Sequence, residues 1–359
     1  MTKKTLKTIL FILPDLNQGG AERVITTLCN ELDRTKFCPK LVLFKKEGYY
    51  LTHLKKDVEI IELNVSRIRY SIFKILPLIK QLKPAIVFTG WGEISAFLSP
   101  LIFLFPNTKF ITRETNVVSK HVTRKEILFF YRFYNNFHQV VAQSDDMKND
   151  LIQNFGIDEN RIVKINNPVD FEMINRLSNE TIDLDFKKER FNLVAIGNLS
   201  PRKGFDLLLN VMSKLKDKNI HLTILGDGAY KEELLQQKEQ LKLDNVTFKG
   251  KVANPFVYLK KADLFILSSR YEGFPNVLLE AGACGTFSLA NNCLGGINEI
   301  VEEGINAEIF PIENTIGFSN KIQEVLSNNY PKENIIASIY SRFSKEKIMK
   351  EYEAIFEKI

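Results

Sequence analysis

The chain has 359 residues, of which 45% are apolar and 26% are charged, a composition that is typical of a folded globular protein. This length exceeds what one hydrophobic core organises, so we expect two domains. The four cysteines form no metal-ligand spacing and no disulfide framework, and the longest uncharged stretch, residues 94–108, is too short to cross a bilayer. These features argue against a transmembrane protein and a disulfide scaffold, and they predict a cytoplasmic protein.

Positive charge is concentrated in the first half of the chain. Residues 1–170 contain 25 Lys and Arg against 17 Asp and Glu, whereas residues 171–359 contain 24 against 26. A basic half predicts contact with an anionic partner, such as phospholipid headgroups or a phosphorylated acceptor, although solvated surface lysines give the same count. Nucleic acid is disfavoured, because the basic residues belong to no recognisable nucleic-acid motif.

Apolar runs of strand length alternate with helical patterns through both halves. The predicted strands are 9–13, 40–44, 85–89, 110–112 and 139–142, then 192–196, 222–225, 246–248, 264–267 and 286–289. This alternation predicts two doubly wound parallel sheets, with a polar interdomain linker at residues 171–190. Such sheets bind ligands beyond the carboxyl ends of their strands, and two of them in tandem leave a central cleft.

The first predicted strand is followed by a glycine pair, Gly19 and Gly20, at the start of a helix. Unpaired N–H groups and the helix dipole favour an anion there, and glycine lets a ligand approach the backbone closely. The loop lacks the spacing of dinucleotide-binding and P-loop motifs, so a plain tight turn is the alternative interpretation.

In the second half, the strand at 192–196 leads into Gly197-Asn-Leu-Ser-Pro-Arg-Lys-Gly204, which opens a helix. Arg202 and Lys203 then lie beside free helix N–H groups. Two fixed cations and a helix terminus suit a diphosphate, although exposed loop charges would give the same pattern.

The densest group of candidate residues follows the strand at 264–267. Pro275 fits the first position of a helix, which leaves Glu272 in the preceding loop and Glu280 more than one turn inside. Side chains on a helix lean toward its N-terminus, so Glu280 suits the paired hydroxyls of a ribose, whereas Glu272 would accept from hydroxyls of a sugar. A surface helix residue and a turn residue are the competing interpretation. The other predicted substrate contacts of this segment are Gly273, Phe274, Asn276, Val277 and Leu278, and the N–H groups of residues 276–278 would hold an anion.

One more loop carries a glycine pair, Gly295 and Gly296, after the strand at 286–289. Its backbone would again be able to approach a ligand. Each of these loops is a weak signal by itself, and their shared position after strands strengthens the prediction of a binding site.

Taken together, the motifs resemble the family-4 retaining glycosyltransferases, which include group 1 glycosyltransferases of bacterial surface glycan synthesis. The motifs that carry the resemblance are Gly-Gly-Ala-Glu-Arg at 19–23, Asn-Pro-Val-Asp at 167–170, Arg-Lys-Gly at 202–204, Gly-Asp-Gly at 226–228, and Glu272 with Glu280. They are ordered and spaced as in that family, and the match covers nearly the whole chain.

The resemblance implies a GT-B fold, an α/β architecture of two Rossmann-like doubly wound domains facing a central cleft. Residues 1–170 would form an acceptor-binding domain and residues 171–340 a nucleotide-sugar-binding domain. A helix within residues 341–359 would cross back to the first domain.

The resemblance also implies roles for individual residues. Lys203 and Arg202 would hold the diphosphate and Glu280 the ribose, while Glu272 would face the transferred sugar. The positions near the base would be Gly226, Lys251 and Val252. No metal or other cofactor is implied, because cations and helix N-termini would stabilise the leaving nucleoside diphosphate.

Two positions depart from the family pattern. Asn198 stands where the family usually has Arg, so one phosphate contact is missing unless Arg202 compensates. Many members have His after the strand equivalent to residues 110–112, but here the sequence is Arg113-Glu114-Thr115. Glu114 or Arg113 would then contact the reacting sugar or the acceptor.

The segment at residues 120–137 is basic and rich in aromatic residues, and Arg67, Arg69 and Lys74 flank another apolar and basic segment. Such segments in an acceptor domain favour peripheral contact with an anionic membrane, on the inner face of the cell membrane. Core packing with basic exposed faces is the alternative.

The function we expect from the sequence is transfer of a hexose or N-acetylhexosamine from a nucleoside diphosphate sugar, with UDP as the expected nucleotide. The acceptor would be a glycan or a polyprenyl-linked glycan. A nucleotide-sugar epimerase and a non-catalytic nucleotide-sugar-binding protein are the alternatives, since the same architecture hosts other activities.

Overall fold

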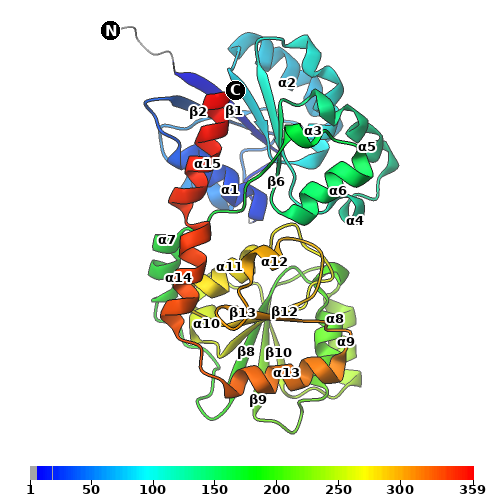
Figure 1. The fold of residues 1–359 in the computed structure, drawn as a ribbon, viewed down its shortest axis with the longest axis vertical. Helices are drawn as coiled ribbons and strands as arrows, with labels where there is room; N and C mark the ends of the chain where they lie inside the picture. Colours follow the sequence, from blue (N-terminus) through cyan, green and yellow to red (C-terminus); the bar gives the residue numbers. More distant parts are fainter. Residues whose placement is uncertain (1–5, 18) are drawn as a thin grey trace. The chain divides into compact units, whose positions relative to one another are not determined.

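The computed structural model describes residues 6–17 and 19–359, which divide into two compact α/β units (Figure 1). The first unit contains the described residues up to Pro168 together with Glu346–Ile359, and the second contains Val169–Lys345. The sequence had placed these divisions after residues 170 and 340.

Backbone pairing inside the second unit accounts for the observed boundaries. The N–H of Val169 donates to the carbonyl of Phe343 at 2.8 Å, and the N–H of Lys345 donates to the carbonyl of Val169 at 3.0 Å. Asp170 also forms an ion pair with Lys345 at 3.1 Å. The two places where the chain passes between the units are therefore hydrogen-bonded to each other.

The first unit is built on a seven-stranded parallel sheet with the strand order β3-β2-β1-β4-β5-β6-β7. Its strands are β1 (Lys7–Leu13), β2 (Phe37–Leu43), β3 (Glu59–Glu62), β4 (Ile86–Thr89), β5 (Lys109–Arg113), β6 (Gln139–Ala142) and β7 (Ile162–Lys164). Its helices are α1 (Gly20–Glu31), η1 (Tyr49–His53), α2 (Ile68–Leu82), α3 (Gly92–Leu98), η2 (Ser99–Leu104), α4 (Val118–His121), α5 (Lys125–Phe130), η3 (Tyr131–Asn136), α6 (Asp145–Phe155), η4 (Glu159–Arg161) and α15 (Lys345–Lys358).

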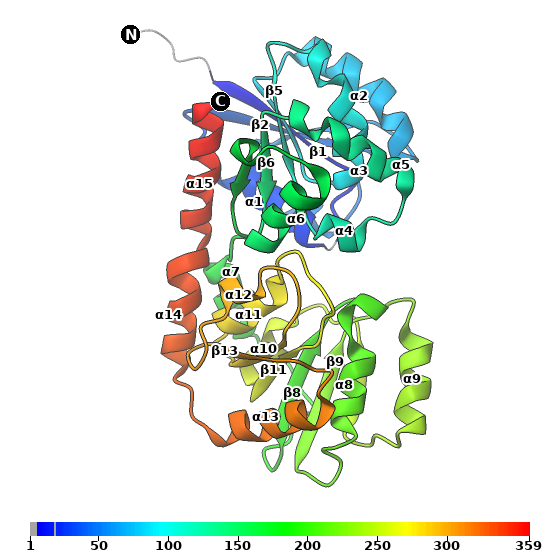
Figure 2. The same cartoon turned by 45° about the vertical axis from the view of Figure 1, so that its right-hand side comes forward.

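Helix α15 completes the first unit by packing beside β1 and α1 (Figures 1 and 2). Its residues Ile348, Tyr352 and Phe356 are buried in the same core cluster as the sheet residues Phe11 and Phe88. The expected final helix is thus present, and it belongs to the first core.

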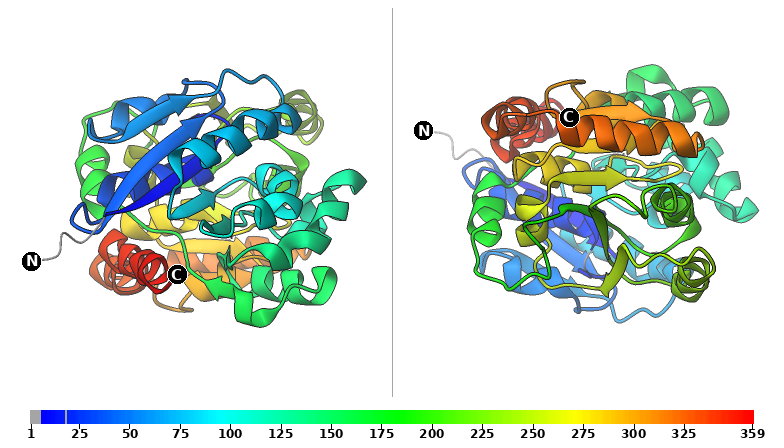
Figure 3. Two further views of the ribbon diagram at one scale, coloured as in Figure 1. Left: turned by 90° about the horizontal axis from the view of Figure 1, so that it is seen from above. Right: turned by 90° about the horizontal axis from the view of Figure 1, so that it is seen from below.

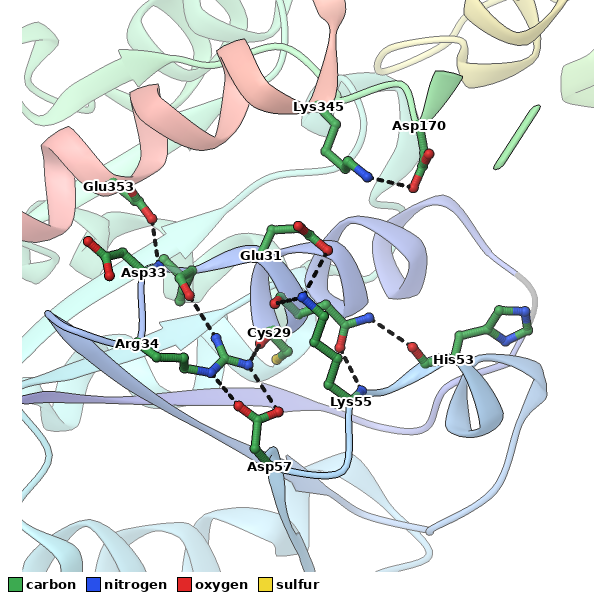
Figure 4. A network of polar contacts seen from close by, with 12 residues as sticks. Cys29, Glu31, Asp33, Arg34, His53, Lys55, Asp57, Asp170, Lys345 and Glu353 are labelled. Atoms are coloured by element: carbon green, nitrogen blue, oxygen red, sulfur yellow. Dashed lines mark hydrogen bonds and ion pairs between the residues drawn. The ribbon is translucent and has the colours of Figure 1, made fainter. Parts of the chain in front are cut away.

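Polar contacts supplement this packing at the turn between α1 and β2 (Figure 4). The carboxylate of Glu353 on α15 accepts from the backbone N–H of Asp33 at 2.8 Å. In the same turn, Arg34 forms an ion pair with Asp57 at 2.6 Å and donates to the carbonyl of Cys29 at 2.7 Å.

The second unit has a six-stranded parallel sheet with the order β10-β9-β8-β11-β12-β13. Its strands are β8 (Phe191–Ile196), β9 (Ile220–Leu225), β10 (Val246–Gly250), β11 (Leu264–Leu267), β12 (Ser288–Asn291) and β13 (Ala307–Phe310). Its helices are α7 (Phe171–Ser178), η5 (Pro201–Lys203), α8 (Phe205–Met212), α9 (Lys231–Gln240), α10 (Phe256–Lys261), α11 (Asn276–Ala283), α12 (Ile297–Ile300), α13 (Thr315–Ser327) and α14 (Lys332–Phe343).

Each sheet has helices on both faces and a separate apolar core cluster on each face (Figure 3). The strand order reverses between β1 and β4 in the first unit and between β8 and β11 in the second. Both units are therefore Rossmann-like and doubly wound, as expected, and each has a point where ligand-binding loops can diverge.

Two local predictions were wrong. The segment at residues 171–190 was expected to be a linker, but it begins with α7, because the Asp170 side chain accepts from the N–H of Met173 and caps a helix that buries Ile174. The strand expected at 286–289 is present as β12, but it begins and ends two residues later, at Ser288 and Asn291; the Thr286 hydroxyl, ahead of the strand, donates to the carbonyl of Leu259 in α10.

Candidate active site

The candidate residues of the second unit lie in α11 and in the segments that follow β8, β9, β10, β11 and β12, and these segments are tied together by backbone hydrogen bonds. The N–H of Arg270 donates to the carbonyl of Arg202 at 2.8 Å, and the N–H of Glu272 donates to the carbonyl of Leu294 at 2.8 Å. The loops after β8, β11 and β12 therefore form one continuous structure at the carboxyl edge of the sheet.

Glycine is required where two of these loops approach other backbone. Gly204 has a φ of +64°, and a Cβ there would lie 2.0 Å from the carbonyl oxygen of Ser268. Gly226 has a φ of +141°, and a Cβ there would lie 1.9 Å from the carbonyl oxygen of Gly197. These glycines allow the loops to pack closely.

The loop after β11 carries a carboxylate that contacts both cations of the loop after β8. Oε1 of Glu272 lies 2.6 Å from Nζ of Lys203, and Oε2 lies 2.7 Å from Nη1 of Arg202. The hydroxyl of Ser269 donates to Oε1 at 2.6 Å. The structure thus joins the three residues that the sequence had selected as the catalytic group.

The electrostatic state of Glu272 follows from this environment. Burial raises the pKa of its carboxyl, but the charges of Lys203 and Arg202 and the hydrogen bonds from Lys203 and Ser269 outweigh burial, so the pKa is lowered. Glu272 is therefore a carboxylate at neutral pH.

Lys203 is held in position along its whole length. Its aliphatic stem packs over Gly197, where an added Cβ would lie 3.2 Å from Cδ, and its carbonyl accepts from the hydroxyl of Ser268 at 2.8 Å. Only 11% of the side chain is exposed, compared with 26% for Arg202.

The glycine pair after β12 supports the Glu272 loop. A Cβ on Gly295 would lie 2.6 Å from the carbonyl oxygen of Glu272, and the N–H of Gly296 donates to the carbonyl of Gly273 at 2.9 Å. A Cβ on Gly296 would lie 2.0 Å from the ring of Phe274. These glycines therefore allow the loop after β12 to pack closely against the loop that contains Glu272.

Helix α11 begins at Asn276, with Pro275 one residue before it. Glu280 lies within this helix and is buried. The side chain of Leu278 belongs to the core, and its N–H donates to the carbonyl of Pro275 at 3.0 Å. This bond corrects the expected set of anion-binding N–H groups, because the N–H of Leu278 is already used. Val277 is half-buried and packs against the same core.

The three positions expected near the base lie in adjoining loops. The N–H of Gly226, after β9, donates to the carbonyl of Gly250, which ends β10. Lys251 and Val252 follow directly; Lys251 is exposed and Val252 packs against the core. Asp185, which precedes β8 in the chain, forms an ion pair with Lys249 of β10 at 2.6 Å.

In the first unit, the glycine pair starts α1 as predicted, but the space beside it contains a carboxylate. Gly19 is the N-cap of α1, and a Cβ there would lie 2.1 Å from Oε2 of Glu22. Glu22 is buried, and burial raises its pKa. Gly20 is the first residue of the helix. An anion at this helix end would meet the Glu22 side chain.

Arg113 and Glu114, the two candidates for the missing histidine, have different environments at the end of β5. Arg113 is fully buried and its Nη2 donates to the side chain of Asn167. Burial raises the pKa of Tyr352 in α15, and the charge of the Arg113 guanidinium opposes this rise. Arg113 is therefore directed into the core of the first unit.

Glu114 is a buried carboxyl with two phenol partners. The hydroxyl of Tyr134 donates to Oε1 at 2.8 Å, the hydroxyl of Tyr131 donates to Oε2 at 3.3 Å, and the two phenol rings stack at 4.2 Å. Burial raises the pKa of Glu114 to about 7, against the lowering effect of the tyrosine hydrogen bonds. Glu114 can therefore hold or release a proton near neutral pH.

Sequence reasoning missed Ser269, Glu22, Tyr131 and Tyr134 as members of these sites. Ser269 lies two residues after the predicted strand at 264–267, and Glu22 stands at the third position of α1, where a glutamate commonly folds back on the helix end. The two tyrosines are three residues apart and were grouped with the aromatic residues of the segment at 120–137.

No helix among residues 6–17 and 19–359 is both long and apolar enough to cross a membrane.

Comparison with known proteins gives two family matches. Residues 18–173 match the model described as Glycosyltransferase Family 4, and residues 179–342 match the model described as Glycosyl transferases group 1. The two matches follow one another along the chain and agree with its division into two units.

Curated relatives carry glycosyltransferase names. An uncharacterised glycosyltransferase of Methanocaldococcus jannaschii is 29% identical over 65% of this chain and 62% of that protein. The N-acetylgalactosamine-N,N'-diacetylbacillosaminyl-diphospho-undecaprenol 4-alpha-N-acetylgalactosaminyltransferase of Campylobacter jejuni is 28% identical over 79% of this chain and 80% of that protein.

Among solved structures, the Anabaena protein HepE in complex with UDP and glucose superposes with a TM-score of 0.82 at 20% identity, over 98% of this chain and 100% of that one. The fold is the expected GT-B architecture of two Rossmann-like domains. With both family models matched in order along it, the chain belongs to the group 1 glycosyltransferases of family 4.

Proposed function

We propose that this chain transfers a hexose or an N-acetylhexosamine from a UDP-sugar to a glycan or a lipid-linked glycan, with retention of the anomeric configuration. The observation that carries the proposal is the contact of Glu272 with Lys203 and Arg202 at the carboxyl ends of β8 and β11. Two cations suit a diphosphate, and the carboxylate suits the hydroxyls of a sugar.

In the proposed reaction, the bond between the anomeric carbon and the diphosphate oxygen breaks, and the acceptor hydroxyl oxygen bonds to that carbon. The hydroxyl proton passes to the departing diphosphate. Lys203 and Arg202 stabilise the negative charge that develops on the leaving group, which is the work that a metal ion performs in other enzymes. We therefore propose a metal-independent transferase.

The rest of the donor site is assigned within the second unit. Glu280, buried in α11, would bind the ribose hydroxyls, and the loops that contain Gly226 and Lys251 would contact the base. UDP is the proposed nucleotide, and the HepE complex, which has the same fold and contains UDP, supports this choice.

The acceptor is assigned to the first unit. The Campylobacter relative is named as acting on a diphospho-undecaprenol-linked glycan, which supports a polyprenyl-linked acceptor for this chain as well. Of the two candidates after β5, we favour Glu114 as the acceptor contact, because Arg113 is directed into the core.

A lipid-linked acceptor requires access to a membrane, and the first unit has a surface that suits one. Helices α2, α3 and α5 cover the same face of the first sheet (Figures 1 and 2). Phe73 on α2 is 76% exposed and Phe103 on η2 is 73% exposed, and Phe129 on α5 is also exposed. We call these three residues the aromatic surface.

Charge complements the aromatic surface. Helix α2 contains Arg69, Lys74 and Lys80 and no acidic residue, and the guanidinium of Arg132 lies 4.9 Å from the ring of Phe129. Exposed aromatic residues beside cations favour peripheral contact with anionic lipid on the inner face of the cell membrane. Arg124 contributes little, because it forms ion pairs with Glu93 and Glu126.

The transfer proposal is tested by measuring thermal stabilisation with UDP-, GDP- and ADP-sugars, and then by product analysis with a polyprenyl-linked glycan. A ligand at 100 times its Kd adds about 2.7 kcal/mol of stability. We expect a UDP-sugar to stabilise the protein and the lipid-linked glycan to gain one sugar. Conversion of the UDP-sugar without any acceptor would indicate an epimerase, and unchanged cellular glycan in Glu272→Ala would indicate a non-catalytic protein.

Membrane contact is tested by flotation with anionic liposomes at low salt. We expect the wild-type protein to float, and the double variant Phe73→Ser with Phe129→Ser to float less. The matched control is Ile316→Ser, because Ile316 is an exposed apolar residue on α13 of the second unit. Equal flotation of wild type and double variant would rule out the aromatic surface as the contact.

A further inference from the structure

We infer that Glu272 competes with the donor diphosphate for Lys203 and Arg202, and that this competition makes the site prefer the sugar nucleotide to the nucleoside diphosphate product. The inference rests on the proposed function, and it adds to the proposed phosphate site a preference for one ligand over another. Glu272 becomes a residue that sets ligand preference.

The competition follows from how the two cations are engaged. Each oxygen of Glu272 contacts a different cation, at 2.6 Å for Lys203 and 2.7 Å for Arg202. Lys203 has little freedom to serve a second anion in another direction, because its stem packs over Gly197 and only 11% of its side chain is exposed. A diphosphate that binds these cations must therefore take contacts from Glu272.

Displacement of Glu272 has a cost that depends on the ligand. The Glu272 side chain is only 6% exposed, and a buried carboxylate that loses its cations is unstable unless other groups donate hydrogen bonds to it. The hydroxyls of a bound sugar can supply these hydrogen bonds. A nucleoside diphosphate carries no sugar at that position, so it displaces Glu272 without compensation.

The consequence is a difference between substrate and product. When the sugar nucleotide binds, its diphosphate contacts Lys203 and Arg202 in place of Glu272. Its sugar hydroxyls then donate hydrogen bonds to the Glu272 carboxylate in place of the two cations. After transfer the sugar leaves with the acceptor, Glu272 loses the hydrogen bonds from the sugar hydroxyls, and its return to Lys203 and Arg202 helps to expel the UDP. Glu272 thereby limits product inhibition.

The inference is tested by isothermal titration of UDP, and of the UDP-sugar that stabilises the wild type most, into the wild type and Glu272→Gln. The glutamine keeps the size and can still accept from Ser269, but it carries no charge. We expect UDP to bind Glu272→Gln about tenfold more tightly, a factor that corresponds to about 1.4 kcal/mol. The affinity for the UDP-sugar should change by less than about threefold, since the sugar also loses its carboxylate partner.

Two further variants complete the experiment. Ser269→Ala weakens the anchoring of the carboxylate without removing its charge, so UDP affinity should rise by a smaller factor. Glu308→Gln is the charge-matched control. Glu308 on β13 forms an ion pair with Lys321 on α13, outside the candidate loops, so loss of its charge should leave UDP affinity unchanged. Urea unfolding of each variant establishes that it is folded.

The outcomes separate the inference from the proposed function. Weaker or unchanged UDP binding by folded Glu272→Gln, with normal binding by the wild type, would overturn the inference alone and leave Glu272 as a residue that positions the cations. Failure of the wild type to bind UDP, any UDP-sugar or pyrophosphate would overturn the proposed phosphate site and the inference with it.

Discussion

Replacement of Lys203 by methionine tests the proposed origin of the rate enhancement. Methionine keeps an unbranched apolar stem that can pack over Gly197, and it removes the ammonium that lies 2.6 Å from Glu272. If that ammonium stabilises charge on the leaving diphosphate, kcat at saturating UDP-sugar should fall by roughly 10²–10³, equivalent to about 2.7–4 kcal/mol.

The same substitution has a predictable effect on stability. Breaking a buried ion pair typically costs about 3–5 kcal/mol, and because Glu272 keeps Arg202 and Ser269 we expect a loss of about 2 kcal/mol. Turnover of a radiolabelled UDP-sugar and urea unfolding measure the two effects separately. Lys249→Met is the control, because Lys249 forms an exposed ion pair with Asp185, and its kcat should equal that of wild type. Wild-type kcat in a destabilised Lys203→Met would refute the catalytic role.

Three further predictions concern stability. The Phe356 side chain is fully buried and contacts four aromatic rings, so Phe356→Ala should lower the free energy of unfolding by about 3–5 kcal/mol in urea titration. Gly204→Ala should cost at least about 1–3 kcal/mol, because it combines a φ of +64° with a clash against the Ser268 carbonyl, whereas Gly156→Ala, with φ +63° and open space, should cost less. Burial raises the pKa of Glu114 from the ordinary glutamate value of 4.5 to about 7 in the folded protein, so the native state binds the extra proton and stability should fall as pH rises from 4.5 to 7. In Glu114→Gln the loss of stability between pH 4.5 and 7 should be smaller by up to about 3 kcal/mol. Parallel profiles of stability against pH for wild type and Glu114→Gln would disprove proton uptake by Glu114.

Strands with a continuous apolar run were predictable from the sequence, and the edge strands β3 and β7 of the first sheet were not. The strands at 139–142 and 264–267 have the predicted bounds, because a buried parallel strand is a continuous apolar run bounded by polar residues. The edge strand β3 reads Glu-Ile-Ile-Glu and is exposed at both ends, so it lacks such a run. The edge strand β7 has only three residues, which is too short for a pattern to appear.

The sequence located the residues of the candidate site but did not predict their contacts. Arg202, Lys203 and Glu272 were selected because each follows a strand, and any parallel sheet places such residues at one edge. Their contact depends on the pairing of β8 with β11, which aligns Leu193 with Leu264. That register is set by the whole core, and no local pattern in either loop reveals it.

The first-unit candidates show a second limit of sequence reasoning. Arg113 and Glu114 are neighbours in the chain, and the sequence treated them as equivalent candidates. Successive side chains at the end of a strand point to opposite faces of the sheet, so Arg113 turns toward Asn167 while Glu114 turns toward the two tyrosines. Which face holds the helices α5 and η3 is a property of the topology, and it decides the environment of each residue.

The return of α15 to the first unit has a consequence for how the protein is made. The first core lacks Ile348, Tyr352 and Phe356 until translation has passed them, whereas the second core is complete once Phe343 has been synthesised. During synthesis the second unit can therefore become a native folded body while the first still exposes apolar surface beside β1 and α1. A chain that terminates before α15 should leave this surface open to chaperones and proteases, although all residues of the Glu272 cluster would be present.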